Sequence, residues 1–454
     1  MQNTTQFIGF KRSWLSPLSE SEPPVSFQTV PKLDPVVNRN SISFSIMSYN
    51  ILAQSLCNRR GTLSHCSKEE CRWNFRRENL RREIAHHNMD IIGLQELDYY
   101  DTFWKQELEK MGYLTEFSPQ FNAEKNNQPM PYGLLIGFKK DKFKLVRFEV
   151  IDYKKEIMNK ELTLIEQYEV GMSGNIAMVA VLESVQDPHL ELIVANTHLY
   201  WRPVSNLVRC RQIEVLLDRV KEIQLGMNSD KVNQTILLGD FNTSPNDPPY
   251  SLVTSRSGVS AEEDENAKLF WDRMNSESDT EMSKIYTLHV ENEEFCKEKW
   301  STLNSGLDFE TFYAMQLHQR LVNAKQCVEK IISKHSKYQS LYAFYPKFCP
   351  PDLINISIHN RWNNGDLNMT TYTPNYQSTL DYIFLPTENS TCECLIEKLW
   401  YVPNHEEMIS HVKRVSSKGE ISESEEPLNT FLPNSVHSSD HLPIAATLQV
   451  AYFK

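Results

Sequence analysis

A short apolar run that ends in polar side chains is the feature that most constrains this 454-residue chain. It lies in residues 234–245, Gln-Thr-Ile-Leu-Leu-Gly-Asp-Phe-Asn-Thr-Ser-Pro. The apolar half is typical of a strand buried on both faces, and Pro245 disfavours its continuation. Because residues i and i+2 of a strand point to the same side, Asp240 and Asn242 can face one spot. They could hold a metal ion or a water against a phosphate, or only form an Asx-turn.

Other segments end in the same way. Apolar or alternating patterns predict strands at 41–50, 90–96, 133–139, 175–183, 191–199, 379–385 and 442–450. Helical spacing predicts helices at 73–88, 102–111, 205–225 and 308–337. Each polar residue near a strand end could have a purely local role, such as a helix cap or a turn residue. Together, however, they are four acids, two amides and two histidines. The set is Asn50, Glu96, His198, Asp240, Asn242, Asp381, Asp440 and His441.

This set supports metal-assisted hydrolysis of a phosphodiester. Mg²⁺ needs few protein ligands and prefers oxygen, so Glu96 with Asn50 can supply its site. Asp240 can take the proton of the attacking water, and Asn242 can orient that water. The two histidines can donate to phosphoryl oxygens, and Asp381 or Asp440 can fix a histidine tautomer. A zinc hydrolase is disfavoured because the chain has no HExxH motif.

The remaining segments suggest one domain with additions. Residues 1–40 contain five prolines and no signal-peptide pattern, and we expect a mostly disordered lead-in. Residues 41–454 would form the catalytic domain. A polar and partly helical insertion is expected at about 255–340, irregular over 255–305 and helical after it.

Charge and cysteine usage exclude some classes of protein. A formal net charge of −12 argues against non-specific attraction to a polyanion, although a local basic groove would still permit nucleic-acid chemistry. Nine irregularly spaced cysteines without a CxxC pair suit free thiols in a reducing compartment. No apolar run approaches the length of a membrane span, so no membrane partner is expected.

Six short motifs together resemble the endonuclease/exonuclease/phosphatase (DNase-I-like) superfamily. They are Ser48-Tyr49-Asn50-Ile51-Leu52, Leu94-Gln95-Glu96, Asn196-Thr197-His198-Leu199, Gly239-Asp240-Phe241-Asn242, Asp381-Tyr382-Ile383-Phe384 and Ser439-Asp440-His441-Leu442-Pro443. Within the superfamily, the chain most resembles the deadenylase-type branch of nocturnin- and Angel-like RNA 3′-exonucleases. The resemblance runs from about Ser41 to the carboxyl terminus, except for the insertion. It implies a four-layer α/β sandwich, with two mixed β-sheets face to face and helices outside.

The resemblance also implies residue roles. Glu96 would be the principal Mg²⁺ ligand with Asn50 beside it, and the residues on the scissile phosphate would be Asp240, Asn242, His198 and His441, supported by Asp381 and Asp440. Substrate would be bound by Asn175, Pro203, Tyr372 and Tyr376, with Pro203 against the terminal base and the two tyrosines stacked on a base. Two departures concern this surface: Gly174 stands where the branch often has Asp, and Thr371 where it usually has Asn.

The favoured function is a Mg²⁺-dependent 3′-to-5′ exoribonuclease that trims poly(A) or other RNA 3′ ends, with Mn²⁺ as a substitute. One alternative is a phosphatase acting on a 2′,3′-cyclic or terminal phosphate, a dinucleotide cofactor or a lipid headgroup. Another is a non-catalytic RNA or protein adaptor with the same fold. We expect a monomer in the cytoplasm, also in the nucleus, with a mitochondrial location left open. The insertion could bind a protein partner or extend the substrate groove.

Overall fold

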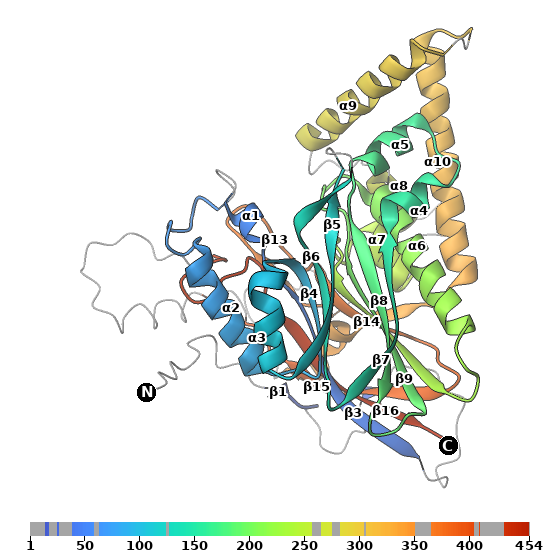
Figure 1. Ribbon diagram of the computed structural model, residues 1–454. Helices are drawn as coiled ribbons and strands as arrows, with labels where there is room; N and C mark the ends of the chain where they lie inside the picture. The colour runs from blue at the N-terminus through green and yellow to red at the C-terminus, as the bar shows by residue number, and fades with distance from the viewer. Residues whose placement is uncertain are drawn as a thin grey trace.

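Two large β-sheets lie face to face, with helices over their outer sides (Figure 1). This computed structural model describes residues 14–17, 25–26, 39–58, 63–123, 127–256, 265–274, 282–303, 306–349, 365–403, 408 and 431–453. The arrangement is a four-layer α/β sandwich, as the sequence predicted.

The first sheet has the strand order β1-β15-β16-β3-β4-β6-β5, with β2 paired to β15. Its strands are β1 (Trp14–Leu15), β2 (Val25–Ser26), β3 (Asn40–Asn50), β4 (Ile91–Asp98), β5 (Tyr113–Asn122), β6 (Gln128–Lys139), β15 (Cys392–Trp400) and β16 (Ile444–Tyr452). Strands β3 and β4 are parallel, so their carboxyl ends meet at one edge of the sheet.

The second sheet has the order β11-β14-β10-β9-β8-β7. Its strands are β7 (Phe143–Asp152), β8 (Ile176–Ser184), β9 (Leu190–His198), β10 (Val232–Asp240), β11 (Tyr338–Ser340) and β14 (Asp381–Pro386). Strands β9 and β10 are parallel, and β14 runs antiparallel to β10. A separate two-stranded ribbon consists of β12 (Thr371–Tyr372) and β13 (Gln377–Ser378).

Three apolar clusters explain why so many strands are continuously apolar. One lies between the sheets and joins residues such as Ile46 and Leu134 to Val194 and Leu238. A second lies between the second sheet and its helices, and a third lies beneath the helices of the first sheet. Central strands are therefore covered on both faces, and alternation with polar residues disappears.

The helices flank the two sheets on opposite sides (Figure 1). The first sheet carries α2 (Trp73–His87) and α3 (Lys105–Lys110), which a π-helical turn at Tyr100–Trp104 precedes, and α1 (Gln54–Cys57) follows β3. The second sheet carries α4 (Tyr153–Met158), α5 (Leu164–Gly171), α6 (Asn206–Leu225), α7 (Pro248–Val253), α8 (Glu265–Met274), α9 (Met282–Trp300) and α10 (Phe309–Lys334). A 3₁₀ segment spans Leu341–Lys347.

One expectation about the insertion needs correction. Segment 255–305 was expected to be irregular, but α8 and α9 occupy 265–274 and 282–300. In α9 the buried residues Leu288, Asn292 and Cys296 recur every four positions, which is a helical stripe that the polar, acidic composition of 255–305 as a whole conceals. In the expected lead-in, 14–15 and 25–26 pair with β15 as short strands, while most of residues 1–40 lie outside the described residues.

The predicted strands that lead to the site are confirmed within a few residues, and so are the helices at α2 and α6. Strands β5, β7 and β15 and the short helices α4, α5 and α7 were not predicted. Among the helices in the described part of the chain, none combines the length and apolarity that a bilayer span requires.

Candidate active site

Strand register brings three of the predicted residues side by side in the second sheet. His198 on β9 and Asp240 on β10 are partners across the parallel pair, and Asp240 pairs with Asp381 on β14. Paired residues of neighbouring strands direct their side chains to the same face. All three side chains are buried.

The first sheet contributes Asn50 and Glu96 at the same end of the sandwich. Asn50 is the last residue of β3, and Glu96 lies on β4 where the register with β6 shifts between Leu94 and Leu97. A bulge of this kind adds a residue to one strand and changes the direction of its side chain. Here the bulge coincides with Glu96, whose φ is +56°.

Left-handed backbone conformations gather around the site. Besides Glu96, the residues Leu52 and Asn242 have φ values of +56° and +47°. Such conformations cost about 1–3 kcal/mol each in a non-glycine residue, and they concentrate at functional sites. Gly239, with φ +142°, precedes Asp240, and a Cβ there would lie 2.0 Å from the Thr197 carbonyl oxygen.

Asn50 links the two buried carboxylates across the sheets. Its Nδ2 donates to Glu96 Oε1 at 3.2 Å and to Asp240 Oδ2 at 3.0 Å. The Leu52 amide donates to Asn50 Oδ1, and the Ala53 amide donates to Glu96 Oε2. In this orientation Asn50 holds the carboxylates together through its amide nitrogen rather than offering its oxygen to a cation.

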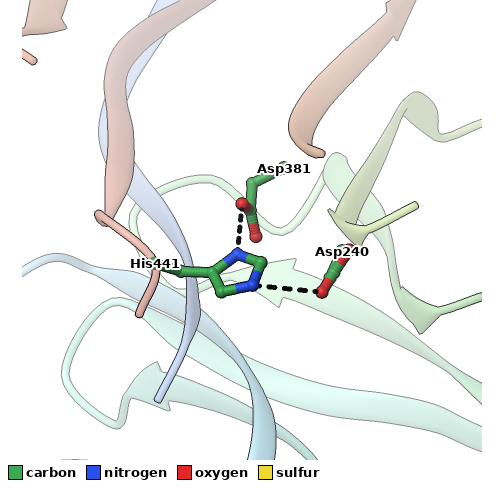
Figure 2. Close-up of side chains that lie close together, drawn as sticks. All are labelled: Asp240, Asp381 and His441. Atoms are coloured by element: carbon green, nitrogen blue, oxygen red, sulfur yellow. Dashed lines mark hydrogen bonds and ion pairs between the residues drawn. The ribbon is translucent and has the colours of Figure 1, made fainter. Parts of the chain in front are cut away.

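Two histidines face the Asp240 carboxylate. Nε2 of His198 lies 3.6 Å from Asp240 Oδ2, and Nε2 of His441 lies 3.8 Å from the same oxygen. Figure 2 shows the His441 ring between the two aspartates, with Nδ1 donating to Asp381 Oδ2 at 2.7 Å. Burial alone would lower the pKa of His441, but the Asp381 carboxylate raises it well above the ordinary value. Asp381 and Asp440 were the two acids expected to fix a histidine tautomer, and Asp381 is the one that orients His441.

The carboxylates fit a divalent cation. Burial raises the pKa of Glu96, against the smaller opposing effect of His198, and among the described residues neither Glu96 nor Asp240 forms an ion pair with Lys or Arg. Oxygen ligands of this kind suit Mg²⁺ or Mn²⁺. A second group, Asp240, Asp381 and His441, also brings three potential ligand atoms within 4.8 Å of one another. In this second group, however, the His441 imidazole already donates to Asp381, and one of the three ligand atoms is a nitrogen instead of an oxygen.

The other predicted polar residues surround this centre. Asn242 donates from its backbone to Asp240 Oδ1 and from Nδ2 to the Leu199 carbonyl. Asp440 lies close enough to Glu96 to raise the pKa of that carboxyl group, and its own buried Oδ1 has no hydrogen-bond partner among the residues that the structure describes. Asn175 is buried and donates to the His198 carbonyl at 2.9 Å, so it supports the strand end.

The predicted base-binding surface needs correction at one position. Tyr372 is fully buried, and its ring packs on Phe431 with centroids 5.1 Å apart. Tyr372 lies on β12 next to Thr371, which forms a β-bridge with His441. Tyr372 therefore supports the loop that carries His441 instead of presenting its ring to a base. Tyr376 is 46% exposed and remains available. Pro203 is half-buried, and its carbonyl accepts from Arg209.

Sequence reasoning missed a buried arginine that holds the site loops together. Arg76 on α2 donates to the carbonyls of Ile51, Leu52 and Ser438. It therefore ties the segment after Asn50 to the loop before His441. Nothing in the sequence separates Arg76 from the solvated arginines of the same helix, because its partners are distant in the chain.

A polar contact between the sheets was missed as well. Gln95 Nε2 donates to Asn196 Oδ1 at 2.8 Å, and Asn196 Nδ2 donates to the carbonyls of Leu94 and Leu135. Both side chains are fully buried. Each stands one or two residues from a site residue, so this contact fixes the distance between the two halves of the site.

Known proteins share this sequence pattern and fold. A sequence model of the Endonuclease/Exonuclease/phosphatase family matches residues 47–441. The probable RNA exonuclease NGL3 of Saccharomyces cerevisiae is 28% identical over 366 residues, covering 77% of this chain and 65% of that protein. Protein angel homolog 2 of Bos taurus is 24% identical over 444 residues, covering 92% and 72%. The chain therefore spans less than two thirds of the yeast relative's length.

The fold also occurs in a solved structure. The crystal structure of ANGEL2, a 2′,3′-cyclic phosphatase, superposes with a TM-score of 0.59 at 22% identity, covering 92% of this chain and 99% of that chain. At this identity the likeness establishes the fold.

Proposed function

The chain belongs to the endonuclease/exonuclease/phosphatase family, and from this we propose that it is a divalent-metal-dependent exoribonuclease that hydrolyses phosphodiester bonds at RNA 3′ ends. One observation carries the proposal: the buried Asp240 carboxylate, which Asn50 joins to Glu96, faces two imidazole Nε2 atoms. The yeast relative, a probable RNA exonuclease, supports RNA as the substrate class.

Asp240 would take the proton of the attacking water. Its Oδ1 accepts a hydrogen bond from the backbone amide of Asn242, and its Oδ2 accepts one from Asn50 Nδ2, so both oxygens are fixed in place. A fixed carboxylate is an effective proton acceptor because no reorganisation is needed during the reaction. Asn242 would hold the water, since it follows Asp240 by two residues in a left-handed conformation.

His198 and His441 would donate to the phosphoryl oxygens as negative charge builds. For His441, the Nδ1–H bond to Asp381 leaves Nε2 as the atom that faces the substrate side of Asp240. Asp381 also favours the protonated imidazole, which is the form that can donate.

Glu96, with Asn50 beside it, would hold the cation. When bound, Mg²⁺ or Mn²⁺ would neutralise phosphate charge and acidify a nearby water. Holding it through Asn50 Oδ1 requires that amide to turn over, because Nδ2 faces the carboxylates in this structure.

A second candidate is a phosphatase that opens a 2′,3′-cyclic phosphate. Support comes from the fold shared with ANGEL2, a 2′,3′-cyclic phosphatase. The same groups would serve both reactions, since each needs an activated water and stabilised phosphoryl oxygens. The two functions differ in the bond that breaks, and therefore in the product.

The test is product analysis on the purified full chain with Mg²⁺. Substrates are 5′-labelled RNAs that end in oligo(A), in mixed sequence or in a 2′,3′-cyclic phosphate. We expect stepwise shortening, of oligo(A) alone or of both ordinary RNAs. Loss of the cyclic phosphate without shortening would transfer the assignment to the phosphatase.

Two variants separate catalysis from folding. Asp240→Asn and Glu96→Gln should each reduce turnover by about 10²–10⁴-fold without loss of the folded state. Glu191→Gln is a matched control, because Glu191 is a buried carboxylate paired with Lys231 near the start of β9, at the opposite end of that strand from His198. Full activity in Asp240→Asn would refute the proposed chemistry.

A further inference from the structure

An exposed tryptophan lies close to the candidate catalytic residues. Trp201 is 63% exposed and follows His198 by three residues. At no more than about 3.6 Å per residue, its Cα lies within about 11 Å of that of His198. Stacked bases rise about 3.4 Å each, so Trp201 is within reach of the last few bases of a strand held at the site.

The loop that carries Trp201 is fixed from inside. Arg209 on α6 is fully buried and donates to the carbonyls of Tyr200, Arg202 and Pro203 at 3.0, 2.6 and 2.7 Å. The Tyr200 amide donates to Gln212 Oε1 at 2.9 Å. The backbone on both sides of Trp201 is therefore fixed, and little loop ordering remains to oppose binding.

The same loop is fixed from outside by the insertion. Arg202 forms an ion pair with Glu291 on α9 at 2.7 Å, and Val204 packs on Leu288 of the same helix. Because Glu291 already neutralises Arg202, the exposed group that this loop offers is the indole ring of Trp201 rather than a free cation. Helix α9 lies against α5 and α10 at the upper end of the sandwich in Figure 1.

The Trp201 ring is available to stack on an unpaired base because it makes little contact within the part of the protein that the structure describes. Its one ring contact among the described residues is an edge contact with Tyr200 at 6.3 Å. With a net charge of −12, the chain gains little from general attraction to a polyanion, so stacking is an effective source of affinity. Trp201 can supply the aromatic surface that the buried Tyr372 cannot.

We propose that Trp201 is a stacking platform for a base near the 3′ end of the RNA substrate, and that Arg209 and Glu291 hold it in position. This rests on the proposed action at RNA 3′ ends. Stacking is sequence-tolerant because every base has a flat aromatic face. Trp201 would therefore select for the presence of a base rather than for its identity.

Binding tests this inference separately from catalysis. The Asp240→Asn chain, with and without Trp201→Ala, is titrated against a fluorescein-labelled single-stranded RNA and against the same RNA with abasic ribose at its last three positions. We expect Trp201→Ala to weaken binding of the base-bearing RNA about tenfold, within the range of about 5- to 150-fold for one stacked base. Binding of the abasic RNA should not change.

Two further variants complete the test. Trp201→Phe should retain most of the affinity, because it keeps a flat ring, and Leu225→Ala controls for the loss of an exposed apolar side chain at the far end of α6. Equal losses on both RNAs, or no loss on either, would overturn the stacking role. Self-association that Trp201→Ala abolishes, with RNA binding unchanged, would assign the ring to a protein contact instead. Turnover by the unsubstituted chain tests the proposed function independently.

Discussion

Replacing Asp381 by asparagine should change the pH range over which the protein is active. Asp381 is fully buried and accepts the His441 Nδ1–H at 2.7 Å. Its charge holds the pKa of His441 well above the ordinary value, against the opposing effect of burial. The substitution keeps the size of the side chain and removes that charge.

The size of the effect follows from this one bond. A hydrogen bond to a charged group contributes about 1.5–3 kcal/mol, and one pKa unit corresponds to about 1.4 kcal/mol. Since both groups are buried, solvent screens their interaction only weakly. Loss of that charge should therefore lower the pKa of His441 and remove about 1.5–3 kcal/mol of stabilisation from the protonated imidazole.

The sign of the pH effect is fixed by the role of His441. A raised pKa keeps the imidazole protonated below that pKa, and donation to the phosphate is lost as the pH rises through it. In Asp381→Asn the alkaline fall of kcat/KM should therefore begin at a lower pH. The assay is kcat/KM on a labelled RNA between about pH 6 and pH 10 at fixed Mg²⁺.

Two results would refute this reasoning. An unchanged alkaline limb would mean that Asp381 does not set the protonation of His441. Activity that is lost but restored by excess Mg²⁺, with an unchanged limb, would make Asp381 a metal ligand in the group of Asp240, Asp381 and His441. Glu191→Gln again serves as the control and should leave the profile unchanged.

Two more predictions concern folding. Gly239→Ala should destabilise the chain by about 3 kcal/mol or more and abolish activity, since the added Cβ would collide with the Thr197 carbonyl. Thermal unfolding measures this loss of stability, and a Tm equal to that of the unsubstituted chain would contradict the prediction. Although burial opposes the shift, Lys160 and Lys330 lower the pKa of the buried Glu214 from 4.5 to about 2. This lowered pKa contributes about 3 kcal/mol to the stability of the folded state above pH 4.5, and the contribution is lost as the pH falls towards 2. Urea unfolding should show this acid loss, and Glu214→Gln should abolish it while lowering stability at neutral pH.

The insertion illustrates how composition misled one sequence-based prediction. Segment 255–305 is polar and acidic as a whole, and this composition concealed a helix within it. Helix α9 forms because Leu288, Asn292 and Cys296 fall on one face, and the helix packs on α5 and α10. Helix formation here depends on tertiary packing more than on local propensity. The stripe was present in the sequence, but the surface that receives it was not.

The sequence by itself determined the strand ends and the residues there. Buried strands are read from apolar runs, and a polar residue at the end of such a run is a local signal, as at Asn50, Glu96, His198 and Asp240. These four side chains do lie together, in the expected four-layer fold. Local patterns suffice for the pairs Asn50–Glu96 and His198–Asp240, because the parallel strands within each sheet direct their carboxyl ends to one edge. The meeting of the two pairs depends on the packing of the sheets.

Tertiary structure decided which side chains meet and which are exposed. The bond from Arg76 to the Ser438 carbonyl joins residues 362 positions apart, and no local pattern distinguishes that arginine from its solvated neighbours. For the same reason the sequence could not tell that Tyr372 is buried while Trp201 is exposed. Burial depends on what the rest of the chain packs against a residue, and that becomes known only when distant segments come together.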